Sequence, residues 1–464
     1  MTQDPIDTLS RALPDGAVLV GADVPAAVAG DWSSADPVMP AALIRPCNTA
    51  EVATALEICN RLGLPVTAQG GRSGLAGGAV PATNGVVLCF ERMAAIEEID
   101  PLAGVAVVQA GVPLAAVQAA ARDQGMMFGV DLGARDSCTI GGNLATNAGG
   151  TRVLRYGMMR ENVLGLEAVL ADGTVISSMN RLLKNNAGYD LKQLFIGTEG
   201  TLGVITRAVL RLQPAPAISA TAFCGFRDTD AMLAFLMRAR TRLGPALSAF
   251  EAMWPSFYTQ MTGALPDLRR PFDAPHGLYV LIEAAGAADE GVEDRLHALL
   301  SESLESGDMA DAVIPASERD RADLWAIRES VAQFDRVFGP VIAFDVGVPV
   351  ATIGDFVARI EAELAEGWPG IVTMSYGHIG DSNLHLVCHL PGVGADQPHA
   401  AVSDRVYRRV VEAGGSVSAE HGIGTLKRKA LALSRSPAEI ALMVRMKRAL
   451  DPNSILNPGK VITP

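Results

Sequence analysis

The sequence predicts an α+β fold: a glycine-rich region of strands and helices, then a large antiparallel sheet covered by helices, then a short helical C-terminal segment. Three observations lead to this prediction. Strand-like and helix-like periods alternate along most of the chain. Glycine clusters are concentrated in the first region, at 41–212. Beyond the prolines at 214 and 216, the same order of strands and helices occurs twice, which favours two related halves of one antiparallel sheet.

Length and composition limit the class of protein. The 464 residues suggest roughly three domain-sized units, and the net charge of −13 argues against nucleic acid or an anionic membrane surface as a partner. No apolar run reaches the roughly eighteen residues of a membrane span, and the N-terminus lacks the apolar core of a secretory signal. The six cysteines form no CxxC pair, so we expect buried thiols in a reducing, cytoplasmic setting.

The first region is expected to contain strands, a helix and a hairpin. The strands lie at 42–46 and 65–71, the helix at 48–65 and the hairpin at 163–178. Asn48 and Glu51 have the spacing of a capping box, which marks the start of the helix. Asp172–Gly173 has the composition of the hairpin's turn.

The prolines at 214 and 216 indicate a linker between the two regions, and we predict that it spans 210–218. The second region then alternates strands and helices. Strands are expected at 219–226, 246–254, 277–285, 341–350, 371–376 and 383–390, and helices at 228–243, 291–306, 318–334 and 352–367. The tail at 434–461 is predicted as a helix followed by a coil that packs back onto the body. We therefore divide the chain into residues 1–214, 215–415 and 416–464.

Three glycine clusters in the first region point to a bound phosphate. They span Gly70–Val80, Thr139–Gly150 and Gly197–Gly203. Consecutive backbone N–H groups in such loops can hold phosphate oxygens without a charged side chain. None matches G-x-G-x-x-G at a strand–helix junction, so a Rossmann site is not indicated. Each cluster alone could be a tight turn, but three together favour a large phosphate-bearing cofactor.

The stretch "SYGHIGDSNLHLVCHL", at 375–390, gathers three of the seven histidines. Its alternating pattern predicts a strand with Asn383, His385 and His389 on one face, and His378 precedes it. "SAEHGIG" adds Glu420 next to His421. Two imidazoles and a carboxylate form a common ligand set for Zn²⁺. A lone histidine is more often a hydrogen-bonded core residue, and this is our interpretation of the other four: His389, His276, His297 and His399.

Six motifs in order carry a resemblance to a known family. They are "GGRSGLAGG", "TIGGNLATNAGGTRVLRYGMMRENVLGLE", "NAGYDLKQLFIGTEGTLGVIT", "GHIGDSNLHL", "SAEHGIGTLKR" and "DPNSILNPGK". Together they cover nearly the whole chain, which resembles the FAD-linked D-2-hydroxy acid dehydrogenases of the vanillyl-alcohol oxidase-type (PCMH-type) FAD fold. The D-2-hydroxyglutarate and D-lactate dehydrogenases are the most similar branch.

The resemblance implies a role for each of the three segments. Residues 1–214 would be a PCMH-type FAD-binding domain of two subdomains, with FAD lying extended between them and its ring facing the second region. Residues 215–415 would bind substrate, and residues 416–464 would complete both sites. The first glycine loop has Arg72 and no histidine, so we expect FAD to be bound non-covalently.

The resemblance also implies site residues. Expected FAD contacts are Gly70, Gly71, Arg72, Ser73, Gly74, Gly77, Thr139, Gly142, Asn143, Thr146, Gly149, Gly150, Gly203, Val204, Ile205 and Asn457. His378, His385 and Glu420 would bind Zn²⁺ or another divalent metal such as Mn²⁺. His421 would be the catalytic base, Arg328 would bind the substrate carboxylate, and Asn383 would hydrogen-bond the substrate. From residue type alone, Arg328 would be an exposed helix arginine.

Two departures bear on the substrate. Relatives selective for glutarate carry a lysine where this chain has Ala343, and a hydroxylated residue where it has Ala332. Burying a second carboxylate without a partner is costly. A smaller or more apolar D-2-hydroxy acid is therefore expected at least as strongly as D-2-hydroxyglutarate.

Two further classes of function remain open on the sequence. One is a metal-dependent hydrolase, and the other is a non-catalytic flavin-binding subunit. For the dehydrogenase, no cysteine motif for an iron–sulfur cluster is present, so electrons would pass to an external acceptor. The acceptor would be an electron-transfer flavoprotein, a quinone or a cytochrome, and the sequence leaves a homodimer open.

Overall fold

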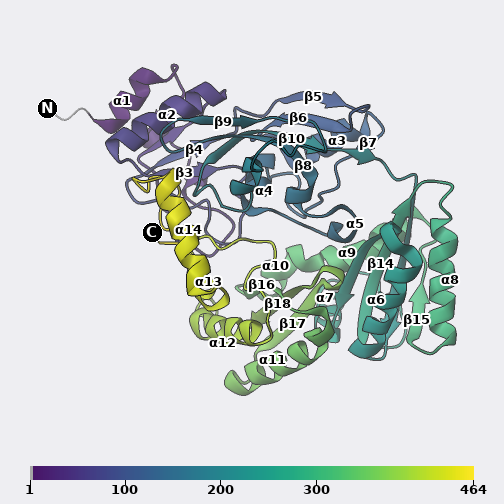
Figure 1. Cartoon of the computed structure of the whole chain (residues 1–464). Helices are drawn as coiled ribbons and strands as arrows, with labels where there is room; N and C mark the ends of the chain where they lie inside the picture. Colours follow the sequence, from purple (N-terminus) through teal and green to yellow (C-terminus); the bar gives the residue numbers. More distant parts are fainter. Residues whose placement is uncertain (1–3, 464) are drawn as a thin grey trace. The chain divides into compact units, whose positions relative to one another are not determined.

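The computed structural model describes residues 4–463, which form two compact units (Figure 1). Unit 1 contains the chain up to Gly150, residues 157–215, and the chain from Glu420 onward. Unit 2 contains residues 151–156 and 216–419. The chain therefore passes from one unit to the other after Gly150, Tyr156, Ala215 and Ala419.

Unit 1 begins with a small sheet covered by two helices. The strand order is β1 (Val18–Val20), β2 (Ala42–Ile44), β4 (Val86–Cys89) and β3 (Val66–Gln69), and β4 is parallel to both β2 and β3. Helices α1 (Pro5–Ala12) and α2 (Thr49–Leu62) supply the apolar residues that bury this sheet.

The start of α2 confirms one half of the predicted capping box. The side chain of Asn48 accepts a hydrogen bond from the backbone N–H of Glu51 at 3.0 Å. The carboxylate of Glu51 accepts from the backbone N–H of Cys47 at 2.8 Å, one residue before the cap, so the return bond differs from the predicted one.

A second sheet in unit 1 is antiparallel. Its order is β5 (Ile96–Asp100), β6 (Val105–Gln109), β10 (Val204–Arg211), β8 (Val163–Val169) and β9 (Val175–Ser178). Helices α3 (Leu114–Arg122) and α4 (Ile140–Thr146) pack on it through their buried apolar residues. The β8–β9 hairpin confirms the predicted turn, where Gly173 has a φ of 84°.

The predicted linker at 210–218 is wrong over most of its length. Strand β10 continues to Arg211, and β11 (Gln213–Pro214) pairs with β7 (Met126–Met127). Strand β12 (Ile218–Phe226) then begins, so only residues 215–217 connect the paired segments. Proline is tolerated in such a short edge pairing, which is why its presence did not end the strand pattern.

Unit 2 contains one antiparallel sheet, as predicted. In the described part of the chain its order is β15, β12, β14, β13, β17, β18, β16. The bounds not yet given are β13 (Leu247–Met253), β14 (Leu278–Gly286), β15 (Met309–Val313), β16 (Ile342–Gly347), β17 (Val372–His378) and β18 (Asn383–His389).

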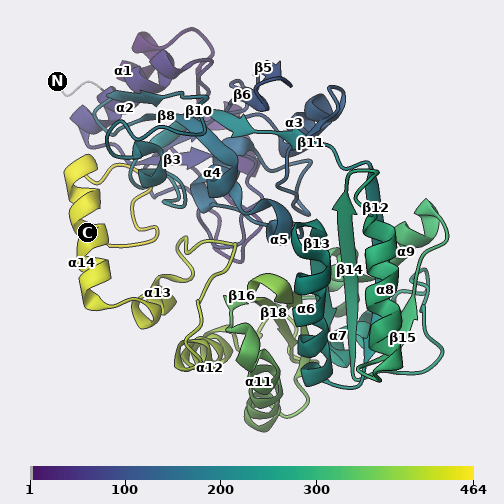
Figure 2. The ribbon, with the colours of Figure 1, turned by 45° about the vertical axis from the view of Figure 1, so that its right-hand side comes forward.

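Helices cover both faces of this sheet. One face packs against α6 (Thr229–Leu243), α8 (Val292–Glu305), α11 (Ile353–Gly367) and α12 (His399–Glu412). Figure 2 shows α6 and α8 side by side along the strands. The other face packs against α7 (Pro255–Ala264), α9 (Glu318–Glu329) and α10 (Phe334–Phe338).

The sheet consists of two related halves, as the repeated order predicted. The first half, β12–α6–β13–β14–α8–β15, has the 4-1-3-2 strand order of a ferredoxin-like unit. The second half, β16–α11–β17–β18–α12, has the same order for its three strands. Where its fourth strand would lie, only a single bridge forms, between Gly347 and Ser416. The halves join where β13 pairs with β17.

Some elements differ from the sequence expectations. The helix predicted at 318–334 ends as α9 at Glu329 and continues as a 3₁₀ turn, where the Ser330 hydroxyl donates to the carbonyl of Ile327. The sequence analysis missed α7, α12 and β15. The predicted C-terminal helix is present as α14 (Pro437–Leu450), preceded by α13 (Arg428–Ser434).

The six cysteines are all free thiols, and five of them are buried. Within residues 4–463, none of the helices has both the length and the apolar character that a membrane crossing requires.

Candidate active site

Polar side chains gather on one face of the unit 2 sheet because of strand alternation. In β13, Phe250 and Ala252 pack under α6, so Glu251 points to the face that α7, α9 and α10 cover. Strand pairing places Glu251 directly opposite His378, and Tyr376 opposite His385. Neighbours across a strand pair on one face lie close together, so the register itself builds a polar cluster.

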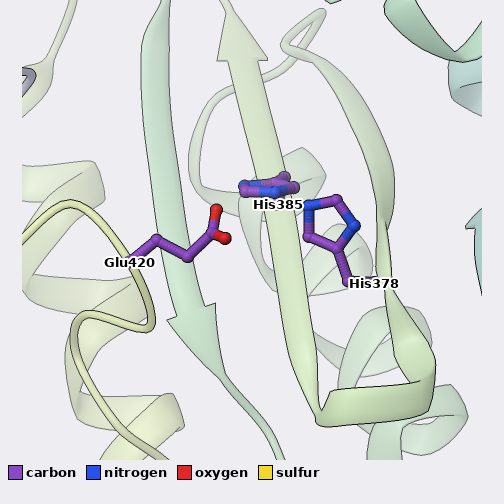
Figure 3. Close-up of side chains that lie close together, drawn as sticks. All are labelled: His378, His385 and Glu420. Atoms are coloured by element: carbon purple, nitrogen blue, oxygen red, sulfur yellow. The ribbon is translucent and has the colours of Figure 1, made fainter. Parts of the chain in front are cut away.

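The predicted metal ligands lie together. His378 and His385 are 6% and 8% exposed, and their rings meet edge to face with centroids 5.3 Å apart. One ligand atom from each of His378, His385 and Glu420 lies within 4.8 Å of the other two. Figure 3 shows the Glu420 carboxylate and the two imidazoles turned toward one another.

The local chain path accounts for the place of Glu420. Ser416 pairs with Gly347 through both of its backbone groups, at 2.8 and 2.9 Å, at the edge of the unit 2 sheet. The Ser418 hydroxyl donates to the carboxylate of Asp345 at 3.4 Å. Glu420 follows Ala419, the last residue of unit 2, so it stands two residues beyond this anchored segment.

The donor set fits a divalent metal ion. Two imidazole nitrogens and one carboxylate oxygen match the ligands that Zn²⁺ and related ions prefer, and they leave room for further ligands. Asn383 is 4% exposed, and its side-chain Oδ1 has no hydrogen-bond partner among residues 4–463. A buried polar atom without a partner normally marks a place where a ligand or water completes the bonding.

Arg328 is buried, contrary to the expectation from residue type alone. It lies in the last turn of α9 and is 5% exposed. Its Nε donates to the carboxylate of Glu251 at 2.8 Å, and its Nη2 lies 3.4 Å from Nε2 of His378. The guanidinium also lies over the ring of Tyr376, 4.8 Å from the centroid. A fixed guanidinium therefore stands next to one of the candidate metal ligands.

Glu251 is a site residue that the sequence analysis missed. Its side chain is fully buried, and Oε1 lies 2.6 Å from Nδ1 of His378. Burial raises the pKa of a carboxyl, but the contacts of Glu251 with His378 and Arg328 outweigh burial, so the pKa of Glu251 lies below its ordinary value. The available signal was a single acidic residue inside the apolar strand "SAFEAMW".

Asp345 was also missed. It is 1% exposed, lies on β16 opposite His385, and one of its oxygens is within 4.8 Å of a Glu420 oxygen and a His421 ring nitrogen. The base predicted at His421 therefore has two carboxylates within reach. Either of them could orient a protonated imidazole.

Three other predictions concern the same region. His389 has the ordinary role expected of it, since its Nδ1 lies 3.0 Å from the carbonyl of Pro340. Ala343 lies on β16 two residues before Asp345, and both Ala343 and Ala332 are exposed. Neither position offers a charged or hydroxyl group to a substrate.

The glycine clusters of unit 1 form a tightly packed loop pair. A Cβ at Gly70 would overlap the hydroxyl of Thr139, and one at Gly71 would overlap the carbonyl of Ser137. The first loop and the segment before α4 therefore meet through their backbones, which only glycine permits. Arg72 has a φ of 56°, and such left-handed non-glycine residues concentrate at functional sites.

The remaining predicted FAD contacts lie around this loop pair and β10. Thr139 caps α4, and its hydroxyl accepts from the backbone N–H of Gly142 at 3.4 Å. The backbone N–H of Gly150 donates to the carboxylate of Glu420 at 2.6 Å. The other positions are distributed over the first loop (Ser73, Gly74, Gly77), over α4 and the residues after it (Asn143, Thr146, Gly149), and over the start of β10 (Gly203, Val204, Ile205).

Asn457 differs from the other predicted FAD contacts because its side chain is already engaged. Its Oδ1 accepts from the backbone N–H of Ala68 on β3 at 3.0 Å, and its Nδ2 donates to the carbonyl of Glu199. These bonds join the C-terminal coil to β3 and to the third glycine cluster. A direct contact between Asn457 and FAD stays a prediction.

Backbone loops rich in glycine suit a phosphate-bearing cofactor. Comparison with known proteins identifies this cofactor as FAD. The model of the FAD linked oxidases, C-terminal domain, matches residues 215–461, and that of the FAD binding domain matches residues 40–178. The chain belongs to the FAD-linked oxidase family, and it is an FAD-dependent dehydrogenase.

Its relatives include two D-2-hydroxyglutarate dehydrogenases. The one from Xanthomonas citri pv. viticola is 38% identical over 440 residues, which are 93% of this chain and 91% of the relative. The mitochondrial one from Arabidopsis thaliana is 38% identical over 420 residues, 90% of this chain and 74% of the relative. The solved structure of p-cresol methylhydroxylase with substrate bound matches 99% of this chain and 96% of its own with a TM-score of 0.80 at 17% identity, which confirms the PCMH-type fold.

The glycine loop leads to a first testable prediction. Gly71→Ala should lower the affinity for FAD at least tenfold, or by about 1.4 kcal/mol, because the new Cβ must push the first loop off the carbonyl of Ser137. The measurement is the flavin absorbance per protein after gel filtration.

Gly133→Ala is the matched control, because a Cβ at Gly133 meets no atom within 4 Å. It should keep the FAD content of the unaltered protein. Circular dichroism checks that both variants are folded. A folded Gly71→Ala variant with a full complement of tightly bound FAD would contradict the assignment of this loop to the cofactor.

Proposed function

We propose that the protein oxidises a D-2-hydroxy acid to the 2-oxo acid with the help of FAD and a divalent metal ion. The observation that carries the proposal is the meeting of His378, His385 and Glu420 within 4.8 Å, with the guanidinium of Arg328 3.4 Å from His378. A cation-binding donor set next to a buried guanidinium suits a small substrate that carries a hydroxyl and a carboxylate side by side.

The names of the relatives support this class of substrate. The two relatives described above are D-2-hydroxyglutarate dehydrogenases. Within that class we propose a D-2-hydroxy acid with one carboxylate, because Ala343 and Ala332 provide no partner for a second one. Strict specificity for D-2-hydroxyglutarate is the alternative that the names of the relatives favour.

The cofactors supply the chemistry that side chains lack. The glycine loops of unit 1 would hold FAD without a covalent link, and the flavin would supply the acceptor for a hydride from the substrate Cα. His378, His385 and Glu420 would hold a Zn²⁺ or Mn²⁺ ion, which would supply the positive charge that lowers the pKa of the substrate hydroxyl.

The chain's own residues bind, orient and deprotonate the substrate. Arg328 has its Nε on Glu251, so its Nη groups are left to pair with the substrate carboxylate. A ring nitrogen of His421 accepts the hydroxyl proton, since a neutral imidazole is a common general base in enzymes. Asn383, with its buried and unpartnered Oδ1, hydrogen-bonds the bound substrate.

Electrons leave the reduced flavin through an external acceptor in this proposal. Residues 4–463 contain six free cysteines and no disulfide, and no pair of cysteines has the spacing of an iron–sulfur motif. An electron-transfer flavoprotein, a quinone or a cytochrome would serve as the acceptor.

An anaerobic panel of hydroxy acids tests the proposal. The purified protein is mixed with the D and L forms of lactate, 2-hydroxybutyrate and 2-hydroxyglutarate, and bleaching of the flavin absorbance is recorded. We expect the D forms to bleach the flavin and the L forms to leave it oxidised, with D-lactate or D-2-hydroxybutyrate the fastest.

The other outcomes separate the competing functions. Fast bleaching by D-2-hydroxyglutarate alone would overturn the argument from Ala343 and keep the enzyme class. Bound FAD that none of the acids reduces would indicate a non-catalytic flavin-binding subunit. Activity on a hydrolysable substrate that continues after FAD is removed would instead favour a metal-dependent hydrolase.

A further inference from the structure

Glu251 makes two contacts with the groups that the proposed function uses. Its Oε2 accepts from Nε of Arg328 at 2.8 Å, and its Oε1 lies 2.6 Å from Nδ1 of His378. All three side chains belong to unit 2, and each is less than a tenth exposed. Both oxygens of one buried carboxylate are therefore taken up by the candidate carboxylate-binding residue and a candidate metal ligand.

The fold fixes Glu251 in this place. Glu251 and His378 are direct partners across the β13–β17 pair, so their side chains leave the sheet on the same face. The last turn of α9, which lies on that face, supplies Arg328. The contact of Glu251 with His378 thus follows from strand register, at the point where the two halves of the sheet join.

The contact determines which nitrogen of His378 carries the ring proton and which can bind a metal ion. A carboxylate only accepts hydrogen bonds, so Nδ1 must carry the proton and Nε2 must keep its lone pair. Figure 3 shows one ring nitrogen of His378 turned toward His385 and Glu420, and the other turned away from them. Because Nδ1 is bonded to Glu251, the nitrogen that faces the other two ligands is Nε2.

The contact with Arg328 has a parallel effect. The Nε edge of the guanidinium is held by Glu251, and its plane rests over the ring of Tyr376. Only the Nη groups remain for a ligand, and Nη2 already lies 3.4 Å from Nε2 of His378. The same carboxylate thus turns the guanidinium toward the place where Nε2 points.

We propose that Glu251 is a positioning residue with two tasks: it holds His378 in the tautomer that offers Nε2 to a divalent ion, and it holds Arg328 with its Nη groups beside that ion. Hydrogen-bonded partners of ligating histidines commonly set ring orientation and metal affinity in this way. The inference rests on the proposed function, because it takes His378 as a metal ligand and Arg328 as the substrate's partner.

The isosteric variant Glu251→Gln keeps the size of the side chain but removes its negative charge and one of its two acceptor oxygens. A glutamine has one acceptor oxygen and one NH₂ group, so it cannot accept from both Arg328 and His378. If its oxygen stays on Arg328, its NH₂ group faces Nδ1 of His378, which must then become the acceptor. The ring proton would move to Nε2 and block the ligand position.

The test uses the full-length, FAD-loaded protein after removal of metal with a chelator. Zn²⁺ binding is measured by competition with a chelating dye, and KM and kcat are measured after reloading. For Glu251→Gln we expect 10–100-fold weaker Zn²⁺ binding and, because a neutral amide oxygen holds Arg328 less firmly than a carboxylate does, a higher KM for the hydroxy acid. Thermal unfolding and flavin absorbance verify that the variant is folded and holds FAD.

Glu361→Gln is the matched control. Glu361 is a partly buried carboxylate of unit 2, and it accepts from the hydroxyls of Ser375 at 2.7 Å and Ser256 at 3.4 Å. Ser375 lies on β17 like His378 but points to the opposite face of the sheet. This variant should bind Zn²⁺ within about twofold of the unaltered protein.

A variant that fails to fold does not end the test. Glu251→Asp keeps the negative charge beside Arg328 but withdraws the carboxylate by one methylene, so we expect a Zn²⁺ affinity between those of the unaltered protein and Glu251→Gln. Equal Zn²⁺ affinity in folded Glu251 variants and in the unaltered protein would overturn the positioning role while leaving the proposed function intact. An unaltered protein that oxidises substrate but binds no metal would overturn the metal part of the proposed function, and the first task of Glu251 with it.

Discussion

The His421→Asn variant is expected to keep its FAD and to reduce it on the order of 10²–10⁴-fold more slowly than the unaltered protein. The reason is that asparagine has no basic nitrogen to receive the hydroxyl proton. Its side chain is otherwise similar to that of histidine in size and can still form hydrogen bonds. His421 has oxygen atoms of Asp345 and Glu420 within 4.8 Å, so an imidazolium formed there would have carboxylates to stabilise it. The measurement is the anaerobic rate of flavin bleaching in a stopped-flow instrument.

His389→Asn serves as the control for this prediction. His389 lies on the same strand as His385, but its ring contacts the carbonyl of Pro340 and it has no role in the proposed chemistry. Its variant should reduce FAD within about twofold of the normal rate. A near-normal rate in His421→Asn, with a full complement of FAD, would remove His421 as the base.

Removing the metal is expected to have an effect of similar size. Dialysis against a chelator should abolish turnover while FAD stays bound, and added Zn²⁺ or Mn²⁺ should restore it. The physical reason is that an alcohol without a bound cation keeps its high pKa, so proton loss no longer accompanies hydride loss. Turnover and elemental analysis are followed on the same samples.

A variant can distinguish loss of the bound metal from other effects of the chelator on the protein. His385→Ala removes one of the three proposed ligands and should lose both metal and turnover. His297→Ala, at an exposed position on α8, should lose neither. If chelation leaves activity unchanged and elemental analysis finds no metal, the cluster is a hydrogen-bonding network and the role given to the ion is wrong.

The antiparallel sheet of unit 2 could be predicted from residue pattern because its strands alternate cleanly. The run from Asn383 to Leu390 shows why: polar and apolar residues alternate along it except at Val387, and β18 lies at Asn383–His389. The cluster of His378 and His385 followed from the same pattern. The motif "SAEHGIG" offered Glu420 as a third candidate, and the family resemblance favoured its role as a ligand although it is distant in the sequence.

Glu251 and Asp345 could not be assigned a role in this way. Each is a single acidic residue within an apolar strand, and nothing local indicates which helix covers that face of the sheet. The burial of Arg328 has the same origin, because it depends on α9 lying over β13 and β17. Such contacts arise only from the tertiary arrangement, which a single sequence does not encode in any short window.

Two missed helices did carry local signals. Helix α7 begins with Pro255 at its first position, which is a favoured place for proline. Helix α12 has Val402, Val406 and Val410 at intervals of four residues, and all three are fully buried. Both signals can be found in the sequence alone.

The path of the chain limits how this protein can be divided or recombined. Residues 151–156 belong to unit 2 although they are separated from its main segment by 157–215. They contribute Arg152, which pairs with Glu283 at 3.4 Å, and Leu154, which packs on the core of the sheet. A gene fragment that encodes only 216–419 would therefore lack part of its own interior and leave a buried acid without its counter-ion. Exchange of the whole of unit 2 between such enzymes would need four splice points, after residues 150, 156, 215 and 419, whereas an exchange of 216–419 alone would mix the interiors of two proteins.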